Sequence, residues 1–463
     1  MRPPHPHLDR PTRGPRPRLS PRKLRALLWL FCVGGLLSWQ LALVSPARAI
    51  AGDLDPGFGT GGKVTTDFAG GPDEAFALAV QPDGKLVAAG GTAGPGLGNF
   101  ALARYNLDGT LDPSFGTGGT VTSSFGGAGD VAFALVVQAD GKLVAAGVVD
   151  TTSGTESDFA LARYNPDGTL DPSFGTGGLV TTDFAATDDR AVGLAVQADG
   201  KLVAAGSTDL VPGGSDFALA RYNPNGTLDP SFGTGGRVTT DFTGDVDVAG
   251  ALAVQANGRL VVAGVTNTPG VTNADFGLVR YRSNGELDRS FGMDGKVTTD
   301  VASINEKALA LAVQADGRLV AAGYTTLPEP ESGDDFALVR YRSNGMLDRS
   351  FGTGGRVTTD FTGSFGLDRA NALVMQADGK LVAAGFAIDP GTILSDFALA
   401  RYNPNGALDP SFGIGGKVTT DFTGGGDAAR GLGVQADGKL VAAGVTAVAG
   451  TCCDFALARY LAS

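Results

Sequence analysis

The amino-acid sequence predicts an all-β fold built from repeated four-stranded units, and three observations lead to this expectation. The phrase "QADGKLVAAG" begins at Gln138 and recurs, identical or nearly so, every 57 to 62 residues. Each interval holds four short stretches of β-like apolar pattern. The 72 glycines are concentrated in the turns between them, because glycine accepts the positive φ that tight turns require. The copies begin at Gln81, Gln138, Gln197, Gln255, Gln314, Gln376 and Gln435.

The third unit shows the expected elements in order. The stretch 191–197, "AVGLAVQ", alternates apolar residues, and the turn "ADG" leads into a second strand over 201–206, "KLVAAG". An Asp-Gly pair between two apolar runs is a strong hairpin signal. A third strand, "DFALARY", covers 216–222, and after the turn "NPNG" and a connector the fourth, "RVTTDF", covers 237–242. Four such strands with two tight turns make one propeller blade.

Seven copies predict a single seven-bladed β-propeller of four-stranded blades over residues 53–460. One blade has two faces to bury, and seven blades in a ring bury each face against a neighbour. Recurring phenylalanines at the positions of Phe58, Phe68 and Phe100 are expected in the core between blades. The half-repeats at 54–68 and 454–460 are complementary. An N-terminal outer strand that pairs with the C-terminal blade would therefore close the ring without an open edge.

The first 49 residues differ from all that follow. Basic residues from Arg2 to Arg25 precede an apolar run over 26–44, which ends near the small residues around Ala47 and Ala49. This order predicts a secretory signal peptide. The apolar run is also nearly long enough to span a bilayer, so an uncleaved membrane anchor is the alternative. Both interpretations predict an exported chain, secreted or exposed on the outside of the cell envelope, with a membrane association only if the segment is uncleaved.

Removal of residues 1–49 leaves 27 Lys and Arg against 47 Asp and Glu, a net charge of −20. A nucleic-acid partner is therefore not expected, because phosphate binding needs clustered bases. Both histidines, His5 and His7, lie in the leader. Without histidine, the common Ser-His and Cys-His nucleophile pairs cannot form.

The tandem pattern "QxDGKLVAAG…DFALARYNPDGTLDPSFGTGGKV" resembles the delta-60 repeat family of exported bacterial proteins. The resemblance covers nearly all of residues 53–460, and it implies a propeller fold and a surface location. It implies no activity, because that family is known by its repeat. Two units depart from the pattern, with "YRSNGELDRSFGMDG" at 281–295 and "YRSNGMLDRSFGTGG" at 341–355.

One face of the predicted propeller is variable and the other is fixed. The links before the first strand and between the second and third strands differ from unit to unit, whereas the "ADGK" and "NPDGTLDPSFGTGG" turns are nearly constant. Variable loops on a rigid frame usually carry binding. The variable face is thus the expected ligand-binding surface of a binding or scaffold module, for a protein or polysaccharide partner outside the cell. Its candidate ligand-binding residues are Tyr324, Asp158, Asp216 and Asp335.

A carboxylate stands eight residues before every recurring glutamine. The seven acids are Asp73, Asp130, Asp189, Asp247, Glu306, Asp368 and Asp427. They are expected to enter the innermost strands and to ring the mouth of the central channel. Such a ring repels itself, and Ca²⁺ bound to the carboxylate oxygens would relieve the repulsion. The alternative, which the sequence favours, is that each acid caps its own loop backbone. Bases that follow three of the acids, Arg190, Lys307 and Arg369, would also neutralise them.

The fixed face offers two further candidates. The variant turns place a cluster of arginines in two neighbouring blades, which could hold an anion: Arg282, Arg289, Arg342 and Arg349. The string "NPDGTLD" at 165–171 has oxygens at alternate positions, as calcium loops do. However, the variant units replace its first Asn with Arg, so a turn explains it better than a metal.

An enzyme is the competing class. A hydrolase or lyase on this chain would have to use carboxylates, alone or with calcium, such as the pairs Asp73/Glu74 and Asp188/Asp189. Adjacent acids are usually solvated loop residues, so a non-enzymatic binding module is the main expectation. It is expected to be a monomer, with no cofactor other than Ca²⁺.

Overall fold

The structure is a computed structural model, in which the chain separates into residues 1–48 and 49–463. It describes residues 49–462 except for 69, 94–97, 128, 151–155, 185–187, 212–213, 243–245, 268–272, 303–304, 329–332, 364, 423 and 448–452. The segment predicted as a signal peptide or anchor lies outside the described residues. Within the described ranges, no helix has the length and apolar character needed to cross a membrane.

The described residues form 28 strands, all antiparallel to their neighbours within sets of four. We call each set a group. The first three groups are β2 (Asp73–Val80), β3 (Leu86–Thr92), β4 (Asn99–Tyr105) and β5 (Thr120–Ser123); β6 (Asp130–Val137), β7 (Leu143–Asp150), β8 (Ser157–Tyr164) and β9 (Leu179–Thr182); and β10 (Asp189–Val196), β11 (Leu202–Val211), β12 (Gly214–Tyr222) and β13 (Arg237–Thr240). The next three are β14 (Asp247–Val254), β15 (Leu260–Asn267), β16 (Ala274–Tyr281) and β17 (Lys296–Thr299); β18 (Glu306–Val313), β19 (Leu319–Leu327), β20 (Gly333–Tyr341) and β21 (Arg356–Thr359); and β22 (Leu367–Met375), β23 (Leu381–Ile388), β24 (Ser395–Tyr402) and β25 (Lys417–Thr420). The last group joins β26 (Asp427–Val434), β27 (Leu440–Ala447) and β28 (Cys453–Tyr460) to β1 (Lys63–Thr66).

The sequence prediction of the third unit matches its observed strands. The first strand begins two residues early, at Asp189, and the hairpin turn closes between Gln197 and Lys201, whose N and O atoms lie 2.8 Å apart. Gly200 in this turn has a φ of +81°, which explains the recurring Asp-Gly. The second strand runs five residues past its predicted end, to Val211, because the variable loop continues the hairpin and pairs Thr208 with Asp216.

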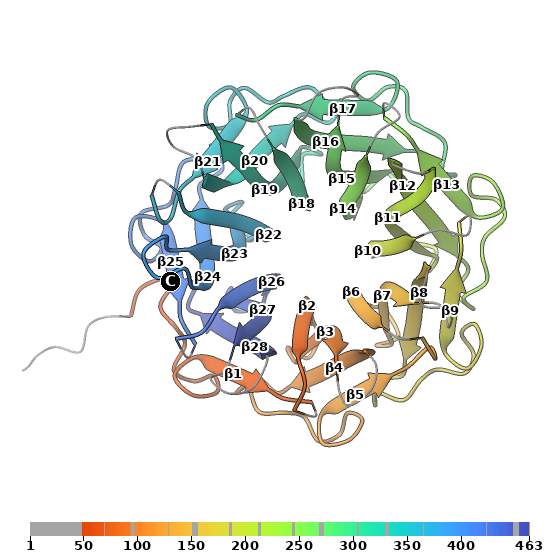
Figure 1. Ribbon diagram of the computed structural model, residues 1–463, viewed down its shortest axis with the longest axis horizontal. Coiled ribbons are helices and arrows are strands. Elements are labelled where there is room, and N and C mark those ends of the chain that lie inside the picture. The colour runs from red at the N-terminus through yellow and green to blue at the C-terminus, as the bar shows by residue number, and fades with distance from the viewer. Residues whose placement is uncertain are drawn as a thin grey trace, which may run out of the picture. The chain divides into compact units, whose positions relative to one another are not determined.

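The first and last strands pair as the half-repeats predicted. In β1 and β28, Lys63 lies opposite Ala458 and Thr66 lies opposite Phe455. Figure 1 shows β1 at the outer side of β28. The N-terminal strand therefore completes the last group.

The groups stand around a common centre, with β2, β6, β10, β14, β18, β22 and β26 nearest to it (Figure 1). Each of these inner strands contacts the inner strand of the next group, and β26 contacts β2. Besides the pairing within groups, one parallel bridge joins β20 to β22, between Asp334 and Leu367.

Each sheet buries both of its faces, as the ring argument required. In β3, Val87 packs in one core with Leu143 of the next group, and Leu86 packs in another with Leu457 of the last group. Phe58 and Phe100 are fully buried in these cores, and Phe68 packs against one of them. The apolar phrase "LVAAG" thus supplies alternate residues to two interfaces between groups, which explains why it is repeated.

Candidate functional site

A cavity of about 720 Å³ opens at the centre of the inner strands, on the side of the variable loops. One residue from each of the seven inner strands lines it, always the third after the initial acid: Phe76, Phe133, Val192, Gly250, Leu309, Asn371 and Arg430. In every inner strand the pairing register shifts at this position, for example between Ala75 and Ala77. A β-bulge turns a residue away from its regular direction, and here it turns six side chains and the backbone of Gly250 toward the centre.

Sequence reasoning missed these seven residues. Within the inner strands they vary in size and charge from unit to unit, whereas the leucine two positions later is constant, as at Leu78 and Leu135. The signal that could have found them is a position that varies between units inside a strand whose neighbouring leucine is constant. The binding surface was predicted from variation in the loops alone.

Basic side chains reach into the cavity from three inner strands. They are Arg190, Lys307 and Arg430. The Arg190 guanidinium lies 3.9 Å from the ring centroid of Phe133, and that of Arg430 lies 5.3 Å from the centroid of Phe76. The two phenylalanines pack edge to face, with centroids 4.9 Å apart. Stacking on aromatic rings holds the guanidinium groups in place and leaves their donors facing the cavity.

These bases repel one another more than carboxylates neutralise them. Desolvation in the cavity, with the charge of Arg430, lowers the pKa of Arg190. Desolvation, with the charges of Arg190 and Arg369, lowers the pKa of Lys307. Neither Arg190 nor Lys307 forms an ion pair with a carboxylate in the described ranges. Arg430 has only a long contact with Glu74, at 3.9 Å, and its Nε is buried without a hydrogen-bond partner.

Acidic residues from the variable loops and the strand ends beside them stand at one side of the same cavity: Asp150, Glu156, Asp188 and Asp209. Glu156 and Asp188 are exposed, and Asp188 accepts a hydrogen bond of 3.2 Å from the Ser157 hydroxyl. Asp188 thus lines the cavity while the adjacent Asp189 is fully buried, so the two acids of this pair, named for the competing enzyme class, lie in different environments. In the pair Asp73/Glu74, Asp73 is likewise fully buried, whereas Glu74 contacts Arg430.

The predicted ring of acids at the channel mouth is wrong in its placement. The seven acids that start the inner strands are at most 1% exposed, and they do not line the cavity. Five of them, Asp73, Asp130, Asp189, Asp247 and Asp427, each accept a backbone N–H bond at 2.6 to 2.8 Å from a phenylalanine five residues earlier. Glu306 and Asp368 cap their loops in the same way, through Val301 and Phe361. The capping alternative is thereby confirmed.

The bases beside three of these acids do not neutralise them, contrary to expectation. Consecutive residues of a strand face opposite sides, so Arg190 and Lys307 turn to the centre while Asp189 and Glu306 turn into the sheet junctions. Arg369 instead pairs with Asp334, at 2.6 Å, and its guanidinium lies 4.3 Å from the centroid of the Tyr324 ring. Tyr324, predicted to bind ligand, is therefore half-buried under an arginine.

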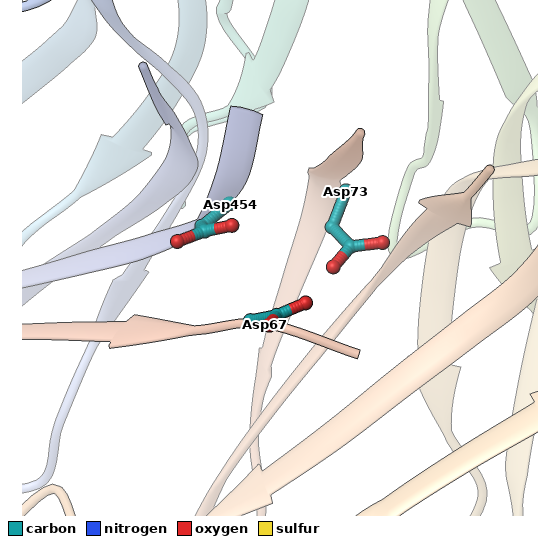
Figure 2. A group of neighbouring side chains, drawn as sticks. All are labelled: Asp67, Asp73 and Asp454. Carbon is teal, nitrogen blue, oxygen red and sulfur yellow. The ribbon is translucent and has the colours of Figure 1, made fainter. Parts of the chain in front are cut away.

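The inner acids are brought together with acids that the sequence analysis had assigned to the variable face. Figure 2 shows Asp67, Asp73 and Asp454 turned toward one another at the junction of the last and first groups. Six clusters of at least three possible metal ligands, with ligand atoms within 4.8 Å of one another, occur among the described residues. Five of them are the trios Asp67/Asp73/Asp454, Asp158/Asp183/Asp189, Asp216/Asp241/Asp247, Asp275/Asp300/Glu306 and Asp335/Asp360/Asp368. The predicted ligand residues Asp158, Asp216 and Asp335 thus lie in trios, half-buried.

The trios carry concentrated negative charge. Burial, together with repulsion from Asp183 and Asp158, raises the pKa of Asp189 to about 6. Burial likewise raises the pKa of Asp247 to about 6, with repulsion from Asp241 and Asp216.

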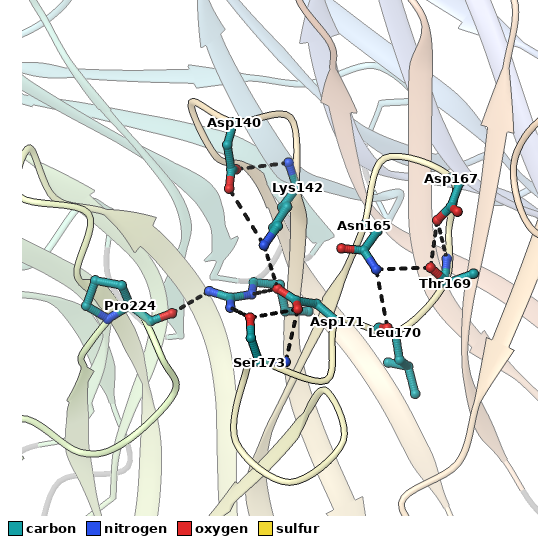
Figure 3. A network of polar contacts seen from close by, with 10 residues as sticks. Asp140, Lys142, Asn165, Asp167, Thr169, Leu170, Asp171, Ser173 and Pro224 are labelled. Atoms are coloured by element: carbon teal, nitrogen blue, oxygen red, sulfur yellow. Dashed lines mark hydrogen bonds and ion pairs between the residues drawn. The ribbon is translucent and has the colours of Figure 1, made fainter.

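The fixed face holds a polar network that repeats with the sequence phrase (Figure 3). Asp171 accepts Nε of Arg163 at 2.7 Å and Nζ of Lys142 at 2.8 Å, and Ser173 donates to its other oxygen at 2.7 Å. Nη1 of Arg163 donates to the carbonyl of Pro224 in the next group. Asp167, in the string once considered for calcium, instead accepts the backbone N–H of Thr169 at 3.0 Å. The constant turns therefore fasten neighbouring sheets.

The predicted anion patch lies in the turns of two successive groups. Arg282, Arg289, Arg342 and Arg349 are all exposed. Arg282 is paired with Glu286 at 3.2 Å. No contact in the described residues brings the four side chains together, so whether they bind an anion stays a prediction.

Comparison with known proteins places these repeats in a class. Six segments match the family described as "Domain of unknown function (DUF5122) beta-propeller", at residues 81–115, 138–174, 197–232, 255–291, 314–351 and 376–412. These six segments are thus similar to the repeat of a β-propeller family. The match is consistent with the delta-60 repeat family that the sequence resembles, but it does not identify that family specifically. No curated protein matches the chain.

Solved structures that align with this chain share little sequence with it. A Dyadobacter fermentans protein of unknown function aligns over 88% of this chain and 100% of its own, with 13% identity and a TM-score of 0.47. The polysaccharide lyase Uly1 aligns over 86% and 91%, with 11% identity and a TM-score of 0.44. Chaetomium thermophilum Sqt1, bound to the N-terminus of ribosomal protein L10, aligns over 85% and 98%, with 13% identity and a TM-score of 0.45.

Proposed function

We propose that the chain is an exported seven-bladed β-propeller, closed by the pairing of β1 with β28, that acts as a binding module. Its ligand site is the central cavity with the variable loops around it. The partner is a protein or polysaccharide that inserts one anionic group, such as a carboxylate, into the cavity. The observation that carries this proposal is the group of bases Arg190, Lys307 and Arg430 on the inner strands, two of which have no carboxylate partner.

The size and position of the cavity support a ligand of limited extent. Small-molecule sites usually measure about 300 to 1,000 Å³, and this cavity, at about 720 Å³, is within that range. Guanidinium groups recognise carboxylates through parallel hydrogen bonds. The rings of Phe76 and Phe133 add an apolar wall, which suits a ring or an apolar stem beside the anionic group.

The loop acids restrict the ligand further. Asp150, Glu156 and Asp188 stand beside the bases and would repel a polyanion that crossed the opening. A single charged group at a chain end avoids this repulsion. This preference is consistent with the net charge of −20 after residue 49, which disfavours nucleic acid.

Calorimetric titration tests the proposal with two pairs of probes. An oligosaccharide ending in a uronic acid is compared with the neutral oligosaccharide of equal length, and a peptide ending in a free carboxylate with its amide. The acidic member of at least one pair is expected to bind, and the pair that does so distinguishes a polysaccharide from a protein partner. Capture from cell-envelope material extends the test to larger partners.

Matched variants locate the site. The double change Arg190→Gln with Lys307→Gln is expected to weaken binding by at least about tenfold, since one charge-assisted hydrogen bond contributes about 1.5 to 3 kcal/mol. The control, Arg282→Gln with Arg342→Gln, removes two exposed charges of the predicted anion patch. If only this control loses binding, the partner docks on the fixed face and the proposal is wrong.

A further inference from the structure

Several junctions between groups combine acidic side chains with buried oxygen atoms that have no hydrogen-bond partner among the described residues. We propose that the trios Asp67/Asp73/Asp454, Asp158/Asp183/Asp189 and Asp216/Asp241/Asp247 each bind one Ca²⁺ ion, which links the outer half of one sheet to the inner strand of the next. This proposal concerns sites away from the cavity and does not depend on the identity of its ligand.

The strands around Asp189 explain how each site spans two groups. Asp158 is the second residue of β8, and Asp183 directly follows β9, so both belong to the second group. Asp189 is the first residue of β10, in the third group. A cation held by all three carboxylates therefore crosses the junction.

The spacing of the ligand atoms fits calcium. One oxygen from each carboxylate lies within 4.8 Å of the other two. Calcium binds oxygen at about 2.3 to 2.6 Å, so two ligands on opposite sides of the ion stand about 4.8 Å apart. Magnesium binds at about 2.0 to 2.1 Å and demands a regular octahedron. Three carboxylates held by separate strands suit the variable coordination of calcium better than that regular geometry.

Unpartnered buried oxygens are a second observation at these three junctions, independent of charge. The same feature occurs at Asp427 and Thr446, between the sixth and last groups, and Oδ1 of Asp130 is also unpartnered among the described residues. Oδ1 of Asp73, Asp189 and Asp247 is buried and has no hydrogen-bond partner, although Oδ2 of each is capped by a backbone N–H. A buried polar atom left without a partner costs about 1 to 3 kcal/mol. These three acids are completely buried and form no ion pair. A cation would satisfy the orphaned oxygen.

A threonine hydroxyl adds a second orphaned oxygen at each of these junctions. Thr92, Thr208 and Thr266 stand opposite the three inner acids on the neighbouring strand and are at most 4% exposed. Each lies beside the carboxylate, yet none of their Oγ1 atoms forms a hydrogen bond of good geometry. Calcium accepts neutral oxygen ligands together with carboxylates.

Two other trios differ in this respect. Glu306 accepts hydrogen bonds from Ala302 and from Thr325. Asp368 accepts one from Thr362, at 3.2 Å. Their carboxylate oxygens are therefore satisfied within the protein, and the proposal does not include them.

The junction between the first two groups is a natural control. Its equivalents of the trio residues are Asn99, Ser124 and Asp130, and Val149 stands where the other junctions have threonine. Two of the three carboxylates and the hydroxyl are missing, yet the strands pair as elsewhere. The fold thus accepts a junction that has lost its acids.

The test measures Ca²⁺ bound to the chelator-treated full chain by equilibrium dialysis, without any partner. At least three equivalents are expected in the millimolar range, which is typical of extracellular sites, with weaker binding of Mg²⁺. The double change Asp158→Asn with Asp183→Ser copies the natural control junction and is expected to lose one equivalent. Thr208→Val is expected to weaken that site several-fold while the fold is kept.

A control with the same change of charge is Asp140→Asn with Asp199→Asn, since both acids are exposed on the fixed face. It is expected to keep the full stoichiometry. The proposal is overturned if the unaltered chain binds no Ca²⁺ up to about 10 mM. It is also overturned if Asp158→Asn with Asp183→Ser keeps the stoichiometry of the unaltered chain. Circular dichroism confirms that each variant is folded, so a loss of equivalents cannot be taken for unfolding.

Discussion

Thr66 in the first strand and Phe455 in the last lie opposite each other in one antiparallel pair. The strand β28 also carries Leu457, which is fully buried between the last and first groups, and Tyr460, which is fully buried between the sixth and last groups. The two ends of the described chain therefore share one sheet and one core.

Deleting residues 454–463 removes this strand and leaves β1 without a partner. Loss of Phe455 and Leu457 from the core is expected to lower the free energy of unfolding by more than about 5 kcal/mol, as large core truncations each cost about 2 to 5 kcal/mol. Denaturant titration followed by circular dichroism measures the change. Deletion of Ser463 alone serves as the control. A truncated chain that unfolds at the same midpoint as the control would contradict ring closure.

Replacement of Asp171 by asparagine tests the network of the fixed face. Its side chain is 6% exposed and pairs with Arg163, which is 7% exposed. Breaking a buried ion pair leaves an uncompensated charge and is expected to cost about 3 to 5 kcal/mol of unfolding free energy. Asp140→Asn changes an acid that is 58% exposed and lies 3.9 Å from the same Lys142. That control is expected to cost less than about 0.5 kcal/mol, and equal losses in both variants would refute the role of the network.

Acid is expected to weaken the chain through the same network. Burial alone would raise the pKa of Asp409, but hydrogen bonds from Ser411 and Lys380 and the charge of Arg401 lower it to about 2, from 3.8. Because the folded pKa is the lower one, this stabilisation is complete above pH 3.8 and is lost as the pH falls toward 2. The pKa values of Asp112, Asp171 and Asp229 are lowered in the same way.

Urea unfolding of the unaltered chain and of Asp409→Asn between pH 2 and pH 7 measures this effect. The difference in unfolding free energy between them should be constant above pH 4 and should shrink below it. A difference that stays constant down to pH 2 would mean that Asp409 does not have a lowered pKa in the folded state.

Filling the central cavity tests it without changing charge. Val192 lines the cavity at the bulge of β10, and Val192→Trp would occupy part of its volume of about 720 Å³. Binding of the acidic probe is expected to fall by at least about tenfold, which corresponds to 1.4 kcal/mol. Met346→Trp, at an exposed turn residue at the other end of the sheets, is the control. Unchanged affinity of Val192→Trp would place the ligand elsewhere.

Much of the fold was predictable because the same turn residues and the same buried residues recur in nearly every unit. The Asp-Gly turns, the buried phenylalanines and the pairing of β1 with β28 follow from local rules applied unit by unit. The site was less predictable. The directions in which Asp189 and Arg190 point depend on which face of β10 is turned to the centre. The inward direction of Val192 depends on a β-bulge, and no turn residue that recurs in the inner strands indicates that bulge.

The acids show the same limit. The sequence predicted Asp189 as one of the inner-strand acids and Asp158 as a candidate ligand-binding residue, so the two belonged to separate sets. It could not show that Asp158, Asp183 and Asp189 converge, because their meeting depends on how one sheet stacks on the next. The distance between consecutive sheets is set by how their side chains pack, and it is therefore seen only in the folded structure.

The bulge has a consequence for how such a chain can change over time. Residues that touch two cores or fasten neighbouring sheets are constrained by their contacts, so copying a unit also copies those constraints. The bulged residue escapes them, and at its seven positions the chain carries phenylalanine, valine, glycine, leucine, asparagine and arginine. Duplicated units can therefore diverge at this position, one codon at a time, and acquire a new recognition pattern while the framework around it is inherited unaltered.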